Sequence, residues 1–255
     1  MNYYVFGDST IGPFICLKNI GHHEINCYKF KGISMSGIIK KNNTYHNKIK
    51  YVLSRIDLNN SSLIFNFGFV DVTFIIFYYL IKYQTFNEII NKHKNYIIQY
   101  VKWINHIKCK NKFIISAYTN SAISIPKYLE NYGYSIKQFK INPMFNILCN
   151  KNNLEKYRRM FNTLLYNECK KYQNIHFIDT DTIIFKNNKI KDIFINKYDN
   201  LSVHLMFEPL AFYLIDTINK NTIYKISLSE YDKQKLKETY NKYIVYKKSI
   251  KSDIL

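Results

Sequence analysis

Short apolar runs bounded by turn residues recur along the chain and predict β-strands. Runs of this length, rich in Val, Ile, Phe and Tyr, are typical of buried strands. Five strands within one domain are the simplest arrangement of these runs. They cover residues 3–6, 25–30, 62–67, 112–117 and 175–178.

Longer segments with apolar residues at helical spacing lie between these runs. The clearest is 86–109, and 154–172 repeats the pattern along one face. Two shorter helices are expected, one at 121–132, ended by Gly133 as a C-cap, and one at 208–218. Strands that alternate with helices of this length predict an α/β fold with a parallel sheet covered on both faces.

The length of the chain suits one domain of this kind followed by a tail. At 255 residues with 47% hydrophobic residues, the chain can bury a sizeable core. We expect the domain over residues 1–220. Residues 221–255 form a lysine-rich amphipathic C-terminal extension with a helix at 231–246. A helix packed on the domain is favoured there over one that binds a membrane surface.

The apolar runs are too short to cross a membrane. A membrane-spanning helix needs about 18 or more apolar residues. The stretch 70–81 is shorter than this, and its second residue is Asp71. The N-terminus has no basic segment followed by an apolar one, as a secretory leader would. We therefore expect an intracellular, cytoplasmic protein. The oligomeric state is left open.

The net charge of +19 raises the alternative of a basic protein that associates with nucleic acid. Nearly all of this charge is lysine, and the arginines are Arg55, Arg158 and Arg159. Arginine is the preferred residue for bidentate contacts to phosphates and bases. The composition therefore favours a solvated lysine surface over a dedicated nucleic-acid site.

The five cysteines do not predict a metal site or a disulfide framework. They are scattered without CxxC spacing, and the histidines offer no ligand spacing either. An odd number of cysteines without a leader indicates reduced thiols. We expect no metal and no cofactor.

The end of the first predicted strand carries a candidate nucleophile. Residues 6–9 read Phe-Gly-Asp-Ser, which places Ser9 at the carboxyl edge of the sheet, where open α/β folds bind their ligands. A serine there can attack a substrate if a histidine accepts its proton. Residues 202–205 read Ser-Val-His-Leu and supply His204. Helix capping is the competing role for Ser9.

Two further segments follow the second and third predicted strands. Residues 32–37 read Gly-Ile-Ser-Met-Ser-Gly after the second strand, and residues 66–71 read Asn-Phe-Gly-Phe-Val-Asp after the third. Together with 6–9 and 202–205, they resemble the SGNH (GDSL-type) hydrolases over roughly residues 1–218. The third segment is most similar to a divergent branch with Gly-Glu-[Ile/Val]-Asp at this place. The resemblance implies a flavodoxin-like, three-layer α/β/α sandwich and an esterase that needs no cofactor.

The resemblance also implies the roles of individual residues. Ser9 is the nucleophile, His204 is the general base, and the oxyanion lies against the N–H of Ser9 and a glycine of the second block. Gly32 matches that glycine best, with Gly37 as the second choice. The remaining site residues support the loops, the two aspartates by accepting backbone hydrogen bonds. They are Asp8, Gly68 and Asp71.

This chain departs from the family at three positions. The family has an aspartate three residues before the histidine, where this chain has Leu201, so Asp199 is the nearest acid. Val70 stands where the family has an asparagine oxyanion donor, and Phe69 replaces the glutamate of the related branch. Removing one such side-chain donor costs about 10²–10³ in rate in other enzymes.

Two functions follow from this balance of matches and departures. The favoured one is a serine esterase that cleaves an acyl ester through an acyl-enzyme on Ser9, with an O-acetyl group on a carbohydrate as a candidate substrate. The alternative is a binding module that keeps the sheet and the pocket without turnover, and Val70 and Leu201 motivate it.

Overall fold

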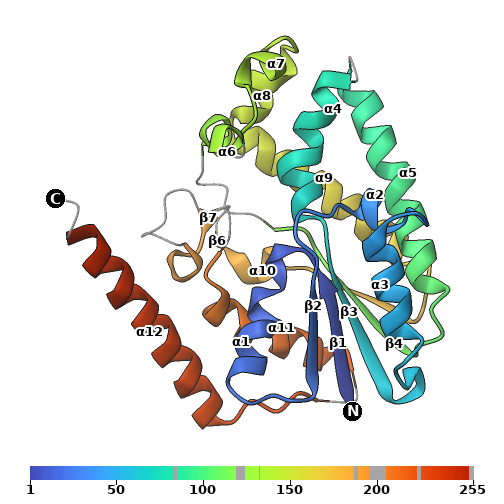
Figure 1. Ribbon diagram of the computed structural model, residues 1–255, viewed down its shortest axis with the longest axis vertical. Helices are drawn as coiled ribbons and strands as arrows, with labels where there is room; N and C mark the ends of the chain where they lie inside the picture. The colour runs from blue at the N-terminus through green and yellow to red at the C-terminus, as the bar shows by residue number, and fades with distance from the viewer. Residues whose placement is uncertain are drawn as a thin grey trace.

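A computed structural model shows five parallel strands in the order β2-β1-β3-β4-β5, with helices on both faces (Figure 1). It describes residues 1–82, 85–118, 124–131, 133–186, 189–195, 205–222 and 225–252. The fold is a three-layer α/β/α sandwich, as the sequence predicted. A short antiparallel hairpin, β6–β7, follows the fifth strand.

The elements follow one another in the α/β alternation that the apolar pattern predicts. The strands are β1 Asn2–Gly7, β2 Ile25–Lys29, β3 Ser61–Asn66, β4 Asn111–Ile115, β5 Ile175–Ile178, β6 Phe185–Lys186 and β7 Lys189–Ile190. The helices are α1 Gly12–Asn19, α2 Met35–Ile38, α3 Thr44–Leu53, α4 Ile76–Lys82, α5 Phe86–Asn105, α6 Ile125–Asn131, α7 Ile136–Lys140, α8 Met144–Cys149, α9 Lys151–Cys169, α10 Asp181–Ile184, α11 Phe207–Lys220 and α12 Glu230–Ser252. Shorter helical turns are η1 Ser9–Ile11, η2 Leu58–Asn60, η3 Asp71–Ile75 and η4 Asp192–Phe194.

Successive side chains of each strand enter two separate cores. Val5 and Ile64 pack on one face with α1 and α11, whereas Phe6 and Phe65 pack on the other face with α3, α5 and α9. This alternation is the period of two that a strand imposes on its side chains. Because both faces are covered, the central strand β3 is buried along its whole length, and its middle residues, Leu63–Phe65, are consecutive apolar residues rather than alternating ones.

All five predicted strands are present, each within two residues of its predicted bounds. The helix predicted at 86–109 is α5, which ends at Asn105, and the one predicted at 154–172 is α9, which begins at Lys151 and ends at Cys169. Asn150 caps α9 by accepting a hydrogen bond from the Asn152 N–H, which explains its earlier start.

The helix predicted at 121–132 is represented by α6, since residues 121–123 and 132 lie outside the described residues. Gly133 follows it with a φ of +79°, the left-handed conformation expected of a glycine C-cap.

Helices α4 and α6–α8 lie beyond the carboxyl ends of the strands (Figure 1). The sequence did not predict α4, α7 or α8 as helices. Their buried side chains, Phe77, Phe139 and Phe145 among them, join the core on the α5 and α9 side of the sheet. They therefore extend the molecule over the edge at which a ligand site is expected.

The tail packs on the α1 and α11 side of the sheet. Ile226 and Leu236 are buried in the same core as α11, and α12 runs from this contact away from the sheet (Figure 1). This packing favours the peripheral helix that the sequence predicted. Among the described helices, none combines the length and the apolar character that crossing a membrane requires.

Candidate active site

The strand order places the candidate serine where the direction of the chain across the sheet reverses. From β1 the chain goes outward to β2, and it then returns to the other side of β1 as β3. The loops after β1 and β3 therefore leave the sheet in opposite directions, and a crevice opens between them. Ser9 follows β1 and residues 67–71 follow β3, so both predicted segments border this crevice.

Gly7 ends β1 where the chain passes very close to β3. A Cβ at this position would lie 2.4 Å from the backbone carbonyl oxygen of Asn66 and 2.3 Å from Cγ2 of Ile11. The same carbonyl oxygen accepts a hydrogen bond from the Asp8 N–H at 3.1 Å. The Gly-Asp-Ser turn therefore needs a glycine first because any side chain would separate β1 from β3.

Asp8, rather than Ser9, caps the helical turn that follows. Its Oδ1 accepts hydrogen bonds from the Thr10 N–H at 2.9 Å and from the Thr10 hydroxyl at 2.6 Å. Ser9 is the first residue of η1, where N–H groups have no partner within the helix. Its half-buried hydroxyl has no hydrogen-bond partner among the described residues. The capping role is thus filled by Asp8, which leaves Ser9 available.

Side chains from two other strands lock this turn in place. The Asn66 amide donates to the Thr10 carbonyl oxygen at 3.1 Å and accepts from the Thr10 hydroxyl at 3.2 Å. The hydroxyl of Tyr118, which follows β4, donates to the same Thr10 carbonyl at 2.6 Å. Ser9 is therefore carried by a turn that hydrogen bonds fix from both sides.

A pocket of about 340 Å³ opens at Ser9. Its walls are largely apolar and its polar atoms come from the serine, the glycine of the second block and two lysines. The lining residues are Ser9, Lys29, Lys31, Gly32, Phe69, Val70, Phe74 and Tyr128. The structure thus brings together Ser9, Gly32 and the segment after β3, as the sequence predicted for one site.

The two glycines predicted to hold the oxyanion differ in what surrounds them. Gly32 lies in the Ser9 pocket with a φ of +69°, and a Cβ on it would meet nothing within 4 Å. The N–H of Gly37 already donates to the carbonyl oxygen of Ser34 at 3.0 Å and to the Ser34 hydroxyl at 3.1 Å. Gly37 lines a different cavity. Gly32 is thus the better placed donor.

Asp71 and Gly68 support the site from the β3 side. Asp71 Oδ2 accepts a hydrogen bond from the Met35 N–H at 2.9 Å, which ties the loop after β2 to the segment after β3. Gly68 has a φ of +119°, which an L side chain rarely adopts, and a Cβ on it would lie 3.0 Å from Ala117 Cβ and from Met35 Cε. These contacts are compatible with the loop-supporting roles that the sequence predicted for Asp71 and Gly68.

The two buried aspartates of the site hold their protons more tightly than usual. Burial raises the pKa of Asp8 to about 6, although its hydrogen bonds with Thr10 and the N–H groups of Phe69 and Val70 act in the opposite direction. Burial raises the pKa of Asp71 to about 7, and the nearby charge of Asp8 adds to this increase. Desolvation disfavours the charged carboxylate in each case.

His204 and Asp199, the predicted base and its acid, lie outside the described residues, as does Leu201. The described chain resumes at Leu205, and α11 begins two residues later. The ring of Phe207, three residues after His204, packs against Gly12, three residues after Ser9, so closely that a Cβ on Gly12 would overlap it.

The arginines on α9 are engaged within the protein. Arg158 is fully buried, where it binds Glu155 and donates to Asp181 at 2.6 Å and to the Ala117 carbonyl at 3.1 Å. Arg159 approaches the same two acids more loosely. These contacts join α9 to the segment after β5. Among the described residues, no cluster of His, Cys, Asp and Glu could hold a metal ion.

Sequence reasoning missed four residues that line the Ser9 pocket. Lys29 and Lys31 could have been found, because Lys29 ends the second strand and Lys31 lies two residues beyond it, so both belong to the same edge of the sheet. Phe74 and Tyr128 come from η3 and α6, and their rings are 4.9 Å apart. No sequence signal announces this contact, because it depends on how helices beyond the sheet edge pack.

Comparisons with known proteins show a likeness of fold. No family model matches the chain, and no curated protein matches it. A solved structure from Streptococcus pneumonia, whose name refers to platelet activating factor, matches with a TM-score of 0.51 and 10% sequence identity. The match covers 86% of this chain and 83% of that chain. At this identity, it supports the α/β/α sandwich alone.

Proposed function

We propose that the protein is a serine esterase of the SGNH type with Ser9 as its nucleophile. The observation that carries this proposal is the Ser9 hydroxyl itself. It lies at the reversal point of the sheet, borders a pocket and is left without a partner by the described residues because Asp8 caps η1. A serine used only for structure would be expected to make the capping bond.

The proposed reaction begins with attack of Ser9 Oγ on the ester carbonyl carbon. His204 takes the serine proton and returns it to the leaving alcohol, and water then hydrolyses the acyl-enzyme by the same route. The packing of Phe207 on Gly12 supports this pairing, since it holds the chain just after His204 beside the helix that begins after Ser9. Asp199 is the proposed acid for His204.

The oxyanion is proposed to lie between the N–H groups of Ser9 and Gly32. Both residues border the pocket, and the N–H of Ser9 belongs to the first residue of a helical turn. Val70 lines the same pocket and offers no side-chain donor. We therefore expect a slower enzyme than one with a third donor, acting on a short acyl ester such as an O-acetyl group whose apolar part lies against Phe69 and Phe74.

The test combines turnover with covalent labelling of the serine. The wild-type protein is expected to hydrolyse 4-nitrophenyl acetate and to be labelled at Ser9 by a fluorophosphonate probe, located by peptide mass spectrometry. Ser9→Ala and His204→Ala are each expected to lower kcat/KM by about 10³-fold or more, since each removes a member of the catalytic pair.

Ser54→Ala is the matched control. Ser54 is exposed at the end of α3, where its hydroxyl donates to the Tyr51 carbonyl, and it does not line the Ser9 pocket. Turnover and labelling should therefore be unchanged. Wild-type turnover in Ser9→Ala would refute the proposal. A folded wild-type protein that neither hydrolyses the ester nor reacts with the probe would instead support the binding module.

A further inference from the structure

A second cavity, of about 570 Å³, lies between α2, α4 and α5, and nothing in the proposed reaction uses it. Its volume is in the range of about 300–1,000 Å³ that is usual for small-molecule sites. Its lining is rich in hydrogen-bonding groups. It comprises Ser34, Ser36, Gly37, Ile39, Lys40, Ile75, Tyr78, Tyr79, Lys82, Lys92, Asn95, Tyr96 and Gln99.

The charge around this cavity has one sign. Lys40, Lys82 and Lys92 come from three separate segments of the chain, are exposed and line the same cavity, and no carboxylate is among the lining residues. Within the described residues, neither Lys40 nor Lys92 forms an ion pair. Lysine is abundant in this chain, so the sign of the charge alone would mean little. Its convergence on a cavity that lacks acids is the informative feature.

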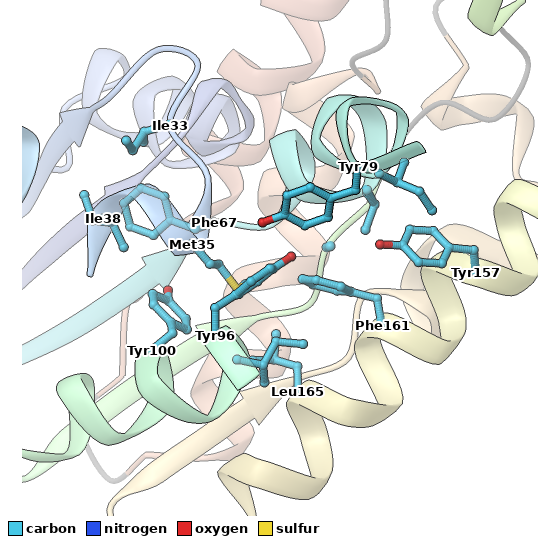
Figure 2. Close-up of a cluster of buried hydrophobic side chains, with 14 of the residues drawn as sticks. Ile33, Met35, Ile38, Phe67, Tyr79, Tyr96, Tyr100, Tyr157, Phe161 and Leu165 are labelled. Carbon is cyan, nitrogen blue, oxygen red and sulfur yellow. The ribbon is translucent and has the colours of Figure 1, made fainter. Parts of the chain in front are cut away.

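The neutral groups of the cavity divide into a rim and a floor. Asn95 and Gln99 are exposed at the rim, one helical turn apart on α5, and add amide donors to the three ammonium groups. Tyr79 and Tyr96 are buried and form the floor, and Figure 2 shows their rings approaching from α4 and α5 with both hydroxyls directed to the same region. Tyr78 is 56% exposed beside them and offers a flat ring to a ligand.

We propose that this cavity binds a phosphorylated small molecule, with Lys40, Lys82 and Lys92 around the phosphate. A phosphomonoester carries a charge of about −1.5 to −2 at pH 7. Three ammonium groups therefore match a phosphomonoester ligand better than a carboxylate ligand, which carries a single negative charge. The cavity is bounded by three helices, whereas single-stranded nucleic acid needs a groove that follows its backbone. A small ligand is therefore the better fit.

The test measures binding of phenyl phosphate by isothermal titration calorimetry, with benzyl alcohol as the neutral comparison. The Lys40→Ala/Lys92→Ala double variant is expected to weaken binding at least about tenfold, since it removes two charge-assisted contacts. The control is Lys41→Ala/Lys94→Ala, which changes the net charge equally at exposed positions beside the first pair but outside the cavity. Melting temperatures confirm that each variant is folded.

A third double variant, Lys29→Ala/Lys31→Ala, removes the lysines of the Ser9 pocket. It is expected to bind phenyl phosphate as the wild type does, and so is Ser9→Ala, which makes the result independent of the proposed esterase activity. Equal losses in the cavity and control variants would refute the proposal, and so would a loss confined to Lys29→Ala/Lys31→Ala. Failure of the wild type to bind phenyl phosphate at millimolar concentration, or displacement of phenyl phosphate by a short single-stranded DNA that binds more tightly, would also overturn it.

Discussion

The carboxyl ends of β1 and β3 are neighbours in the sheet but are held in different ways. After β1, Asp8, Thr10, Asn66 and Tyr118 bind one another and the backbone through a set of buried hydrogen bonds. After β3, Asp71 accepts a hydrogen bond from the Met35 N–H, and its carboxyl lies close to the hydroxyl of Tyr96, a member of an aromatic cluster. In that cluster, shown in Figure 2, the hydroxyl of Tyr100 is buried without a hydrogen-bond partner among the described residues.

The difference matches what each end has to do. Hydrogen bonds fix direction, and a candidate nucleophile needs a fixed direction, so the β1 turn is defined by polar contacts. The β3 end instead positions its loop by the shape of packed side chains, and it keeps a carboxyl that holds a proton near neutral pH. Asp8 at the β1 end also has a pKa raised by burial, to about 6, below the value of about 7 for Asp71. The β1 end should therefore be the more sensitive to shape and hydrogen bonding, and the β3 end the more sensitive to pH near 7.

The strongest test of the β1 end is Gly7→Ala. The added methyl would lie 2.4 Å from the Asn66 carbonyl oxygen, and a backbone atom cannot move aside as a flexible side chain can. We expect the free energy of unfolding to fall by about 3 kcal/mol or more, the upper end of the cost of overpacking. Urea denaturation followed by circular dichroism measures this change.

Gly21→Ala provides the comparison for that variant. Gly21 has a φ of +116°, but a Cβ on it would meet nothing within 4 Å. Gly21→Ala should therefore lower the free energy of unfolding by about 1–2 kcal/mol, from the unfavourable backbone conformation alone and without a steric clash. An equal loss in the two variants would show that the close approach of β1 and β3 does not matter.

The pH test concerns Asp71 at the β3 end. Its pKa is about 7 when folded and near 3.8 when unfolded, so the folded state binds the proton more tightly and stability falls as the pH rises through 7. Asp71→Asn removes this loss, and its amide oxygen can still accept from Met35. We expect the stability of the variant relative to wild type to rise by about 2.7 kcal/mol between pH 5 and pH 8.5, two pH units at about 1.36 kcal/mol each.

The difference between the two proteins is the quantity to measure, because other groups titrate in both. Burial lowers the pKa of His93 to about 3, so this histidine destabilises the folded state as the pH falls below 6.5, opposite in sign to Asp71. It does so equally in wild type and Asp71→Asn. The expected change corresponds to about 5–11 °C in Tm for a domain of this size. Parallel Tm curves across this pH range would contradict the raised pKa.

The sheet could be predicted from the sequence because its strands are buried on both faces. Ser61–Asn66 and Asn111–Ile115 are short apolar runs whose length and turn boundaries identify them without tertiary information. The helices beyond the sheet edge could not be predicted in the same way. Helix α4 lies in an almost uninterrupted apolar stretch without a helical period, and α7 and α8 are only five and six residues long.

The candidate site was predictable where it depends on strand ends and not where it depends on packing. Ser9, Gly32 and the segment after β3 meet because parallel strands bring their carboxyl ends to one edge. The sequence already ranked Gly32 above Gly37, and the structure adds that Gly32 lines the Ser9 pocket whereas Gly37 lines a different cavity and donates its N–H to the Ser34 hydroxyl. Tyr128 reaches the Ser9 pocket, and the three lysines reach the second cavity, through contacts between helices. No sequence motif marks such contacts.

The smallest expected effect compares two tyrosines, one from each end. Both are buried, and Tyr→Phe removes the same hydroxyl from each. The Tyr118 hydroxyl donates to the Thr10 carbonyl at 2.6 Å in the β1 turn, so Tyr118→Phe should cost about 1 kcal/mol. The Tyr100 hydroxyl has no hydrogen-bond partner among the described residues, so Tyr100→Phe should leave stability unchanged or raise it slightly. Urea denaturation of both variants at one pH measures the difference, and a larger loss for Tyr100→Phe would reverse the proposed contrast between the hydrogen-bonded β1 end and the packed β3 end.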